Sequence, residues 1–297
     1  MDIKTYLASR RQLVDDTLTQ LLPQPGNQLD HHVESMNYSL QAGGKRVRPI
    51  LCMAAAEALL GRELGPRLLP VACALECIHT YSLIHDDLPA MDNDALRRGK
   101  PTNHAVYGEA AAILAGDGLH CFAFDLLSSQ DCDDIPPEAR LSIIGVIARA
   151  AGPLGMVGGQ YLDVINEGRE ISYELLRTIH RSKTGALITA AVLAGGIAAG
   201  ASTEQKRLLT SYGNAVGLAF QIVDDILNVE ATPEQLGKAV GSDAARGKAT
   251  YPALFGLDKS KTMAADAVAA ATHALEAFGD DAEPLRALAR YITHRTA

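Results

Sequence analysis

The sequence predicts an all-α protein that folds as one domain of about ten or more helices. Hydrophobic residues make up 47% of the 297 positions and aromatic residues only 5%, a composition that favours helices over sheets. Proline is absent from 102–135 and from 154–232, where apolar side chains recur at helical spacing. Long helices exclude an interior proline. Because no repeat or shift in composition marks a boundary, we expect residues 1–297 to form a single domain.

Composition also bears on partners and location. The formal net charge of -8 argues against nucleic acid as the main partner. The first sixteen residues, MDIKTYLASRRQLVDD, carry charges throughout and lack the apolar stretch of a signal peptide. The five cysteines are odd in number and lie mostly in apolar runs, which predicts reduced thiols in a cytoplasmic protein.

A stretch of twenty uncharged residues from Thr184 to Thr203 is long enough to cross a membrane. It consists mainly of small or weakly hydrophobic residues. We therefore interpret it as a helix in the core and expect no stable membrane insertion.

The most unusual stretch is SLIHDDLPAMDNDALRRGKPT (82–102). The apolar segment 71–84 predicts a helix, and Pro89 prevents its long continuation, so Asp86 and Asp87 fall near its C-terminus. Carboxylates are disfavoured there because the helix dipole is negative at that end. A bound metal ion would relieve the conflict, and so would a solvated loop. Asp92 and Asp94 follow within the same stretch.

A second acidic pair lies in GLAFQIVDDILNV (217–229). Gln221, Asp224, Asp225 and Asn228 have the spacing i, i+3, i+4 and i+7, which places them on one stripe of an otherwise apolar helix. Such a stripe indicates an internal cavity, where carboxylates need a metal ion, a proton or a cationic partner. Oxygen ligands without nearby cysteine favour Mg²⁺, with Mn²⁺ as an alternative.

Phosphate-binding cations accompany both acidic motifs. GGKRVRP (43–49) places three cations at an expected helix start, where backbone N–H groups favour anions. Two arginines follow the first aspartates, a lysine lies in HRSKTGAL (180–187), and two lysines follow the second pair. We interpret these as phosphate ligands: Lys45, Arg46, Arg48, Arg97, Arg98, Lys183, Lys238 and Lys248.

These motifs together resemble the bacterial short-chain isoprenyl diphosphate synthases. DDLPAMD matches the first aspartate-rich motif, DDxxxxD, and GGKRVRP, KTGAL, GLAFQIVDDIL and GKATYPAL occur in the same order, from about Gly43 to Leu254. The farnesyl diphosphate synthases are the most similar members. The resemblance implies an all-α barrel around a central cavity, head-to-tail condensation of isopentenyl diphosphate with dimethylallyl or geranyl diphosphate, and a homodimer.

The resemblance also implies a role for each site residue. About three Mg²⁺ ions would bind Asp86, Asp92 and Asp224, with Asp87 and Asp225 as further ligands or as groups that hold the ligands. The allylic diphosphate would contact Arg97, Lys183 and Lys238, with Lys248 beside them. Isopentenyl diphosphate would contact Lys45, Arg48, His79 and Arg98. Gln221 and the backbone of Lys183 and Thr184 would face the allylic cation.

Product length is predicted from the helix before the first aspartates. Tyr81 lies about 7–8 Å along the helix from Asp86, so its ring, with Ser82 beside it, could form the floor of the cavity. Core packing alone is the other interpretation. In the resembled family an aromatic residue at this position accompanies the C15 product, which predicts farnesyl diphosphate. Geranylgeranyl and geranyl diphosphate remain alternative products.

The sequence departs from the family pattern at two positions, and three other functions are rivals to the one that the resemblance implies. Asn228 replaces the last aspartate of DDxxD and Ala95 replaces a common aspartate.

A di-iron bundle needs two Glu-x-x-His motifs, but Glu76–His79 is the only copy. A terpene cyclase would not need GGKRVRP, and an inactive synthase subunit ordinarily loses the aspartate motifs.

Overall fold

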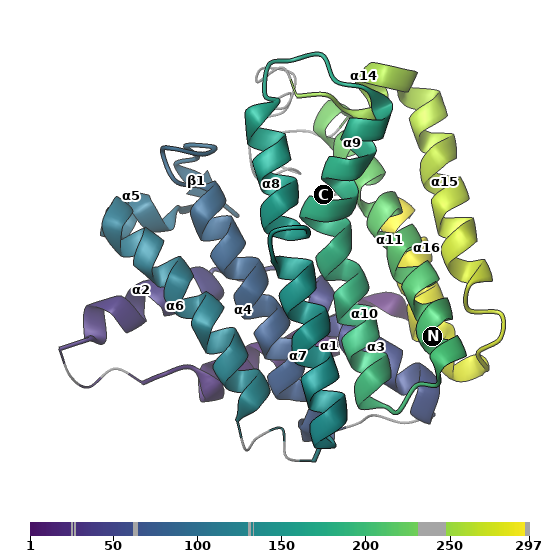
Figure 1. Cartoon of the computed structure of the whole chain (residues 1–297), viewed down its shortest axis with the longest axis horizontal. Helices are drawn as coiled ribbons and strands as arrows, with labels where there is room; N and C mark the ends of the chain where they lie inside the picture. Colours follow the sequence, from purple (N-terminus) through teal and green to yellow (C-terminus); the bar gives the residue numbers. More distant parts are fainter. Residues whose placement is uncertain are drawn as a thin grey trace.

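The computed structural model describes residues 1–24, 26, 28–61, 65–129, 132, 134–230 and 248–294. It confirms the predicted all-α class (Figure 1). Its elements are α1 (Ile3–Leu21), α2 (Asp30–Leu40), α3 (Val47–Leu60), η1 (Gly65–Leu68), α4 (Leu69–Asp86), β1 (Leu96–Arg97), β2 (Lys100–Pro101), α5 (Asn103–Tyr107), α6 (Glu109–Ser128), α7 (Pro137–Ala151), α8 (Met156–Ile165), α9 (Tyr173–His180), η3 (Arg181–Gly185), α10 (Ala186–Ala198), α11 (Thr203–Glu230), α14 (Tyr251–Phe255), α15 (Leu257–His273), η4 (Asp280–Ala282) and α16 (Glu283–His294).

Helix α10 lies at the centre of the bundle and packs against α3, α7 and α11. Nine of its residues, from Leu187 to Gly196, are buried. The prediction that the uncharged stretch forms a core helix is therefore confirmed for this part of it. Around α10, the pairs α4–α6 and α11–α15 make the other large helix contacts. Buried apolar side chains from α1 to α16 form one continuous cluster.

The C-terminal ends of α4, α8 and α11 lie at the upper end of the molecule in Figure 1. The π-helical turn η3 joins α9 to α10 in the same region, and π-helical turns often occur at functional sites because they shift side chains out of helical register. Segments far apart in the sequence thus bring their polar ends together.

A small hairpin was not expected from the sequence. Leu96 pairs with Pro101 and Arg97 with Lys100, in antiparallel register. Arg98 and Gly99 form its turn with φ values of 55° and 75°, as two-residue hairpin turns require. Each strand has only two residues, which is too short to give an alternating pattern.

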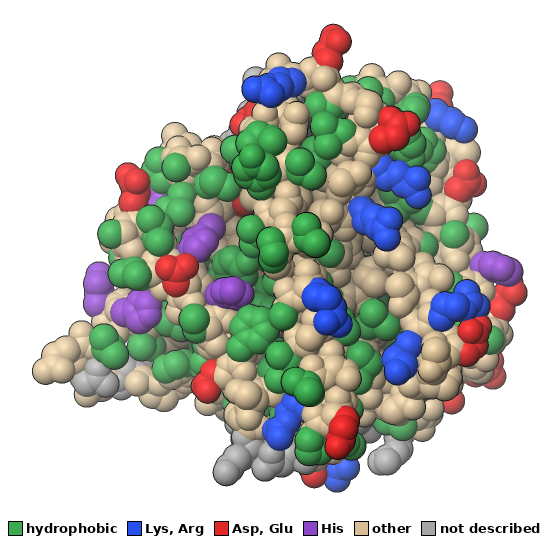
Figure 2. Space-filling model, in the orientation of Figure 1, with side chains coloured by type: hydrophobic (Ala, Val, Ile, Leu, Met, Phe, Trp, Pro, Cys, Tyr) green, Lys and Arg blue, Asp and Glu red, His purple; other side chains and the backbone are tan. Residues whose placement is uncertain are grey.

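Two other segments are long and apolar enough to cross a membrane by length and composition, namely Glu109–Ser128 and Pro137–Ile165. Only 39% and 28% of their most apolar windows are buried, so α6, α7 and α8 present apolar side chains on the surface. Figure 2 shows such side chains gathered over this part of the molecule.

Candidate active site

A polar cavity of about 400 Å³ lies where the ends of α4, α8 and α11 meet. Both acidic motifs line it, through Asp86 and Asp92 on one side and Asp224 and Asp225 on the other. The prediction that the two motifs share one cavity is confirmed. The cations and amides that complete the lining include Lys45, Arg97, Lys183, Thr184, Gln221, Asn228 and Lys248.

An apolar cavity of about 600 Å³ adjoins the polar one. Asp86, Lys183 and Thr184 line both cavities. The remaining wall of the apolar cavity is mostly hydrophobic and comes mainly from α4, α6 and α8, with smaller parts from α3 and from the loop after α4. It includes Arg48, His79, Tyr81, Ser82, Met91, Ile113, Val157 and Tyr161.

Asp86 occupies the last position of α4, as the sequence predicts. The chain then turns back, so that the Asp92 N–H donates to the Asp86 carbonyl at 2.8 Å. Burial raises the pKa of Asp86 to about 6, and the charges of Asp92 and Asp87 add to that shift while Lys183 opposes it. The acid therefore lies in surroundings that disfavour its ionised form unless a further cation is present.

Lys183 and Lys248 bind two acids, Asp163 on α8 and Asp92 in the loop after α4. The Lys183 Nζ lies 2.7 Å from Asp163 Oδ2, and the Lys248 Nζ lies 3.7 Å from the same oxygen and 3.6 Å from Asp92 Oδ1. Burial would raise the pKa of Asp163, but the two lysines outweigh it and hold that pKa below its ordinary value. The cavity thus contains cations beside its carboxylates.

The profile described as "Polyprenyl synthetase" matches residues 30–283. The chain belongs to the polyprenyl synthetase family. It is 46% identical to the farnesyl diphosphate synthase of Geobacillus stearothermophilus over 295 residues, which covers 99% of this chain and 98% of that protein. It is also 46% identical to the geranylgeranyl diphosphate synthase of Cyanophora paradoxa, over 99% of this chain and 97% of that protein.

A solved structure supports the same assignment. The apo structure of an FPP/GFPP synthase from Zymomonas mobilis has a TM-score of 0.87 and 38% identity, with 98% of this chain and 99% of that chain covered. The predicted resemblance to this family is confirmed, and the chain is a prenyltransferase by family.

For Asp87 the expectation left open a metal ligand or a group that holds the ligands of this polyprenyl synthetase. Its carboxylate is 3% exposed and does not line the polar cavity. Instead, both of its oxygens accept from Arg97 Nε at 2.8 Å, and Arg97 Nη2 lies 2.6 Å from Oδ1. Asp87 therefore holds Arg97, which lines the cavity.

Asp225 also has a fixed partner. Its Oδ2 accepts from the Tyr251 backbone N–H at 2.9 Å, which ties α11 to the start of α14. Lys248 lies just before α14, so Asp225 helps to place that lysine. Asn228 is 4% exposed and lines the cavity beside Asp224. Lys238, which we expected near them, lies outside the described residues.

The GGKRVRP cations point in different directions. Helix α3 begins at Val47, as predicted for this motif. Lys45 lines the polar cavity and Arg48 the apolar one. Arg98 joins this loop from the hairpin, since its Nη1 donates to the Gly43 carbonyl. Its guanidinium packs so closely on Gly44 that a Cβ there would lie 2.6 Å from Nη1.

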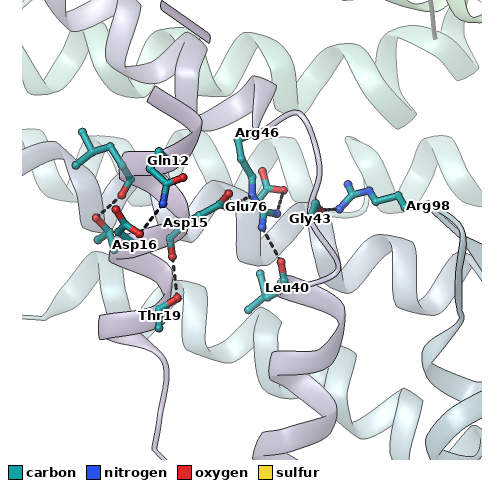
Figure 3. A network of polar contacts seen from close by, with 11 residues as sticks. Gln12, Asp15, Asp16, Thr19, Leu40, Gly43, Arg46, Glu76 and Arg98 are labelled. Carbon is teal, nitrogen blue, oxygen red and sulfur yellow. Dashed lines mark hydrogen bonds and ion pairs between the residues drawn. The ribbon is translucent and has the colours of Figure 1, made fainter. Parts of the chain in front are cut away.

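The interpretation of Arg46 as a phosphate ligand is wrong. Arg46 is 3% exposed, and its Nη1 donates to Glu76 Oε1 at 2.8 Å inside the protein (Figure 3). The same contact gives a structural role to Glu76, which belongs to the single Glu-x-x-His motif considered above for iron binding. The left-handed backbone of Arg46, with φ of 50°, accompanies this inward direction.

Asp163 was not among the residues predicted from the sequence. Gln160 and Asp163 lie at i and i+3 on the apolar helix α8, the same spacing as Gln221 and Asp224, so a signal was present. Helix α8 also approaches η3 closely, because a Cβ on Gly159 would lie 2.2 Å from the Lys183 backbone nitrogen. This close approach brings Asp163 to Lys183.

Proposed function

We propose that this polyprenyl synthetase condenses isopentenyl diphosphate with dimethylallyl diphosphate and then with geranyl diphosphate, to give farnesyl diphosphate. The observation that carries the proposal is the junction of a charged cavity and an apolar one at Asp86, Lys183 and Thr184. An allylic diphosphate has the same two parts, and its reacting C–O bond joins them.

The carboxylates fit Mg²⁺ by their donor atoms. Asp86, Asp92 and Asp224 offer only oxygen ligands to one cavity, and Asp86 lies where a cation would favour its ionised form. The described part of the chain has no group of three metal-binding side chains already placed to hold an ion. Mg²⁺ commonly binds through one or two carboxylates and substrate phosphates, so about three ions would bind together with the diphosphate. Bound Mg²⁺, or Mn²⁺, would stabilise the negative charge of the departing diphosphate.

The cations of the polar cavity bind the allylic diphosphate. Arg97 is fixed by Asp87, and Lys183 and Lys248 lie near the carboxylates, so all three are in place before the substrate arrives. Pre-placed cations stabilise charge as the C–O bond breaks without further reorganisation. By resemblance, Lys238 joins them.

Isopentenyl diphosphate binds through Lys45, Arg48, Arg98 and His79. Burial, followed by the charge of Arg48, holds the pKa of His79 well below its ordinary value, so this imidazole is neutral at pH 7. A neutral imidazole beside arginines can accept or donate a hydrogen bond without adding charge.

The apolar cavity protects the cation formed on the allylic chain. Its hydrophobic walls exclude water and hold the isopentenyl double bond close to the reacting carbon. The side chain of Gln221 and the Lys183–Thr184 backbone face that carbon. By resemblance, the departing pyrophosphate accepts the proton that ends the step.

Tyr81 supports a C15 product. It is 7% exposed, lines the apolar cavity and lies against His120, with ring centroids 4.7 Å apart. A ring held in this way sets a firm floor, and Ser82 lies next to it. Geranylgeranyl diphosphate is the second candidate product, because a relative of that name is equally similar.

A homodimer in the cytoplasm accounts for the exposed apolar face of α6 to α8. Ile113, Val157, Tyr161 and Val164 are 39% to 63% exposed and also line the apolar cavity, so a second copy on this face would close the cavity. All five cysteines are free thiols, which suits the reducing cytoplasm. Sedimentation of the purified protein should give twice the mass of one chain.

The deciding experiment incubates purified protein with dimethylallyl diphosphate, isopentenyl diphosphate and Mg²⁺ and then sizes the products. We expect mainly farnesyl diphosphate, and no product after EDTA treatment. Turnover of an allylic diphosphate without isopentenyl diphosphate would instead indicate a terpene cyclase. Absence of any product would contradict the proposed function.

A further inference from the structure

Arg46 lies between two cations that face cavities, yet it faces the protein interior. It is the residue immediately before α3 and has φ of 50° and ψ of 37°, a left-handed conformation that non-glycine residues seldom adopt. Such a conformation persists only where surrounding contacts hold it. The contacts of Arg46 therefore bear on how Lys45 and Arg48 are directed.

Three elements hold the Arg46 guanidinium (Figure 3). Nη1 donates to Glu76 Oε1 on α4 at 2.8 Å, Nε donates to Asp15 Oδ1 on α1 at 2.7 Å, and Nη2 donates to the Leu40 carbonyl at the end of α2 at 2.6 Å. We call Asp15, Arg46 and Glu76 the Arg46 cluster. Hydrogen bonds between charged groups, as in this cluster, are stronger than those between neutral groups. The contacts of Arg46 join the GGKRVRP loop to α1, α2 and α4.

Glu76 has a second oxygen to account for. Glu76 is 1% exposed, and its Oε2 has no hydrogen-bond partner among the described residues. The Nε of Arg48 is likewise buried without a hydrogen-bond partner among the described residues. A buried polar atom that lacks a partner is costly, so these atoms need a structural or functional reason.

The charge of Glu76 also acts on Arg48, which lines the apolar cavity, and on Arg98, which lines neither the polar nor the apolar cavity. Burial lowers the pKa of Arg48 to about 10, while Glu76 first and Asp224 second oppose that shift. Burial also lowers the pKa of Arg98, and Glu76 is again the leading opposing charge. The charge of Glu76 thus favours the charged form of half-buried Arg48 and of the more exposed Arg98.

We propose that Arg46 and Glu76 are positioning residues for the isopentenyl diphosphate subsite. Their ion pair fixes the backbone before α3, so that Lys45 faces the polar cavity and Arg48 the apolar one, and the remaining charge of Glu76 balances Arg48 and Arg98 until a diphosphate arrives. Neither residue touches the substrate. The inference rests on the proposed function.

The test is steady-state kinetics of Glu76→Gln with each substrate varied in turn. We expect the KM for isopentenyl diphosphate to rise about tenfold, with kcat and the KM for geranyl diphosphate within about threefold of wild type. The reason is that Arg48 and Lys45 bind a diphosphate that does not leave, so its binding is equal in the ground and transition states.

Glu57→Gln is the matched control. Glu57 on α3 accepts from Tyr6 Oη at 2.7 Å and lies 3.0 Å from Arg10 Nη2, so it is a similar carboxylate–arginine pair away from both cavities. It should lower thermal stability while leaving both KM values unchanged. If Glu76→Gln and Glu57→Gln have the same kinetics, the inference is wrong.

Asp15→Asn covers the case in which Glu76→Gln fails to fold. The Asp15 side chain is 36% exposed, and the buried Arg46 keeps its ion pair with Glu76 when Asp15 loses its charge. We expect the same selective rise in the KM for isopentenyl diphosphate, but smaller, and a wild-type KM would overturn the inference. If the wild-type protein forms no product at all, the proposed function itself is wrong.

Discussion

The polar cavity and the apolar cavity meet at the same three residues but are built in different ways. Charged side chains of the polar cavity are held by one another or by backbone groups, as in Asp163–Lys183, Asp87–Arg97 and Asp225 with the Tyr251 N–H. The apolar cavity depends on the size and packing of side chains, such as Tyr81 against His120.

This difference explains why the chemistry is easier to infer than the product. Replacing a carboxylate or a lysine in the polar cavity would remove a hydrogen bond or a charge, whereas an apolar wall tolerates many side chains of altered volume. Relatives that are equally identical to this chain accordingly carry the names of C15 and C20 synthases.

The largest expected effect is that of Asp86→Ala, because Asp86 lines both cavities. We expect kcat to fall about a thousandfold or more, because the protein loses a carboxylate that would bind metal ions at the junction of the two cavities. Circular dichroism should show an unchanged helical fold. Asp125→Ala is the control, since Asp125 is an exposed acid on α6 that lines neither cavity. If Asp86→Ala kept wild-type turnover, the proposal that Asp86 binds the metal ions would be wrong.

Asp163→Asn should affect the polar cavity alone. Without its charge, Lys183 and Lys248 lose the acid that places them, and we expect kcat/KM for geranyl diphosphate to fall about tenfold to a hundredfold. The product distribution should stay the same. Asp134→Asn is a control, because Asp134 pairs with Arg67 on the surface, where ion pairs contribute little. A changed product length in Asp163→Asn would mean that the two cavities do not act separately.

Local sequence signals predicted much of this polar cavity. Pro89 indicated the end of α4, the i, i+3, i+4, i+7 stripe indicated the inner face of α11, and the glycine pair at 43–44 preceded the start of α3. In each case the signal depends on residues within one or two helical turns. The structure confirms all three.

Side-chain directions that depend on distant partners could not be predicted in this way. Arg46 turns inward because Glu76, thirty residues away, offers a buried charge, and Asp87 turns to an arginine in a hairpin too short to recognise. The floor of the apolar cavity likewise depends on His120, which lies on another helix than Tyr81. The local sequence pattern of neither helix indicates that these two rings are in contact.

Tyr81→Ala should affect the apolar cavity alone. Removing the ring opens the floor toward His120, and we expect products longer than C15 while the rate of the first condensation stays within about threefold of wild type. Tyr81→Phe keeps the ring and should keep the product. Chromatography of dephosphorylated products would measure both. An unaltered chain length in Tyr81→Ala would assign Tyr81 to core packing only.

The smallest expected effect concerns stability without metal. The pKa of Asp86 is about 6 in the folded protein against an ordinary value of 3.8, so folding favours the protonated acid. Unfolding therefore releases a proton between these values, and the contribution of Asp86 to stability falls as the pH rises from 3.8 to about 6. Above that range the full cost of the buried charge remains.

Asp86→Asn removes this cost while leaving the shape of the side chain. In EDTA at neutral pH, we expect its Tm to exceed that of wild type by a few degrees, and the difference should shrink as the pH approaches 3.8. Asp225→Asn should have the opposite sign, because the charged Asp225 oxygen accepts from the Tyr251 N–H and a neutral amide accepts more weakly. Calorimetry of the three proteins at both pH values would measure the effect. A Tm of Asp86→Asn at or below wild type at neutral pH would show that the polar cavity already balances its acids without metal ions.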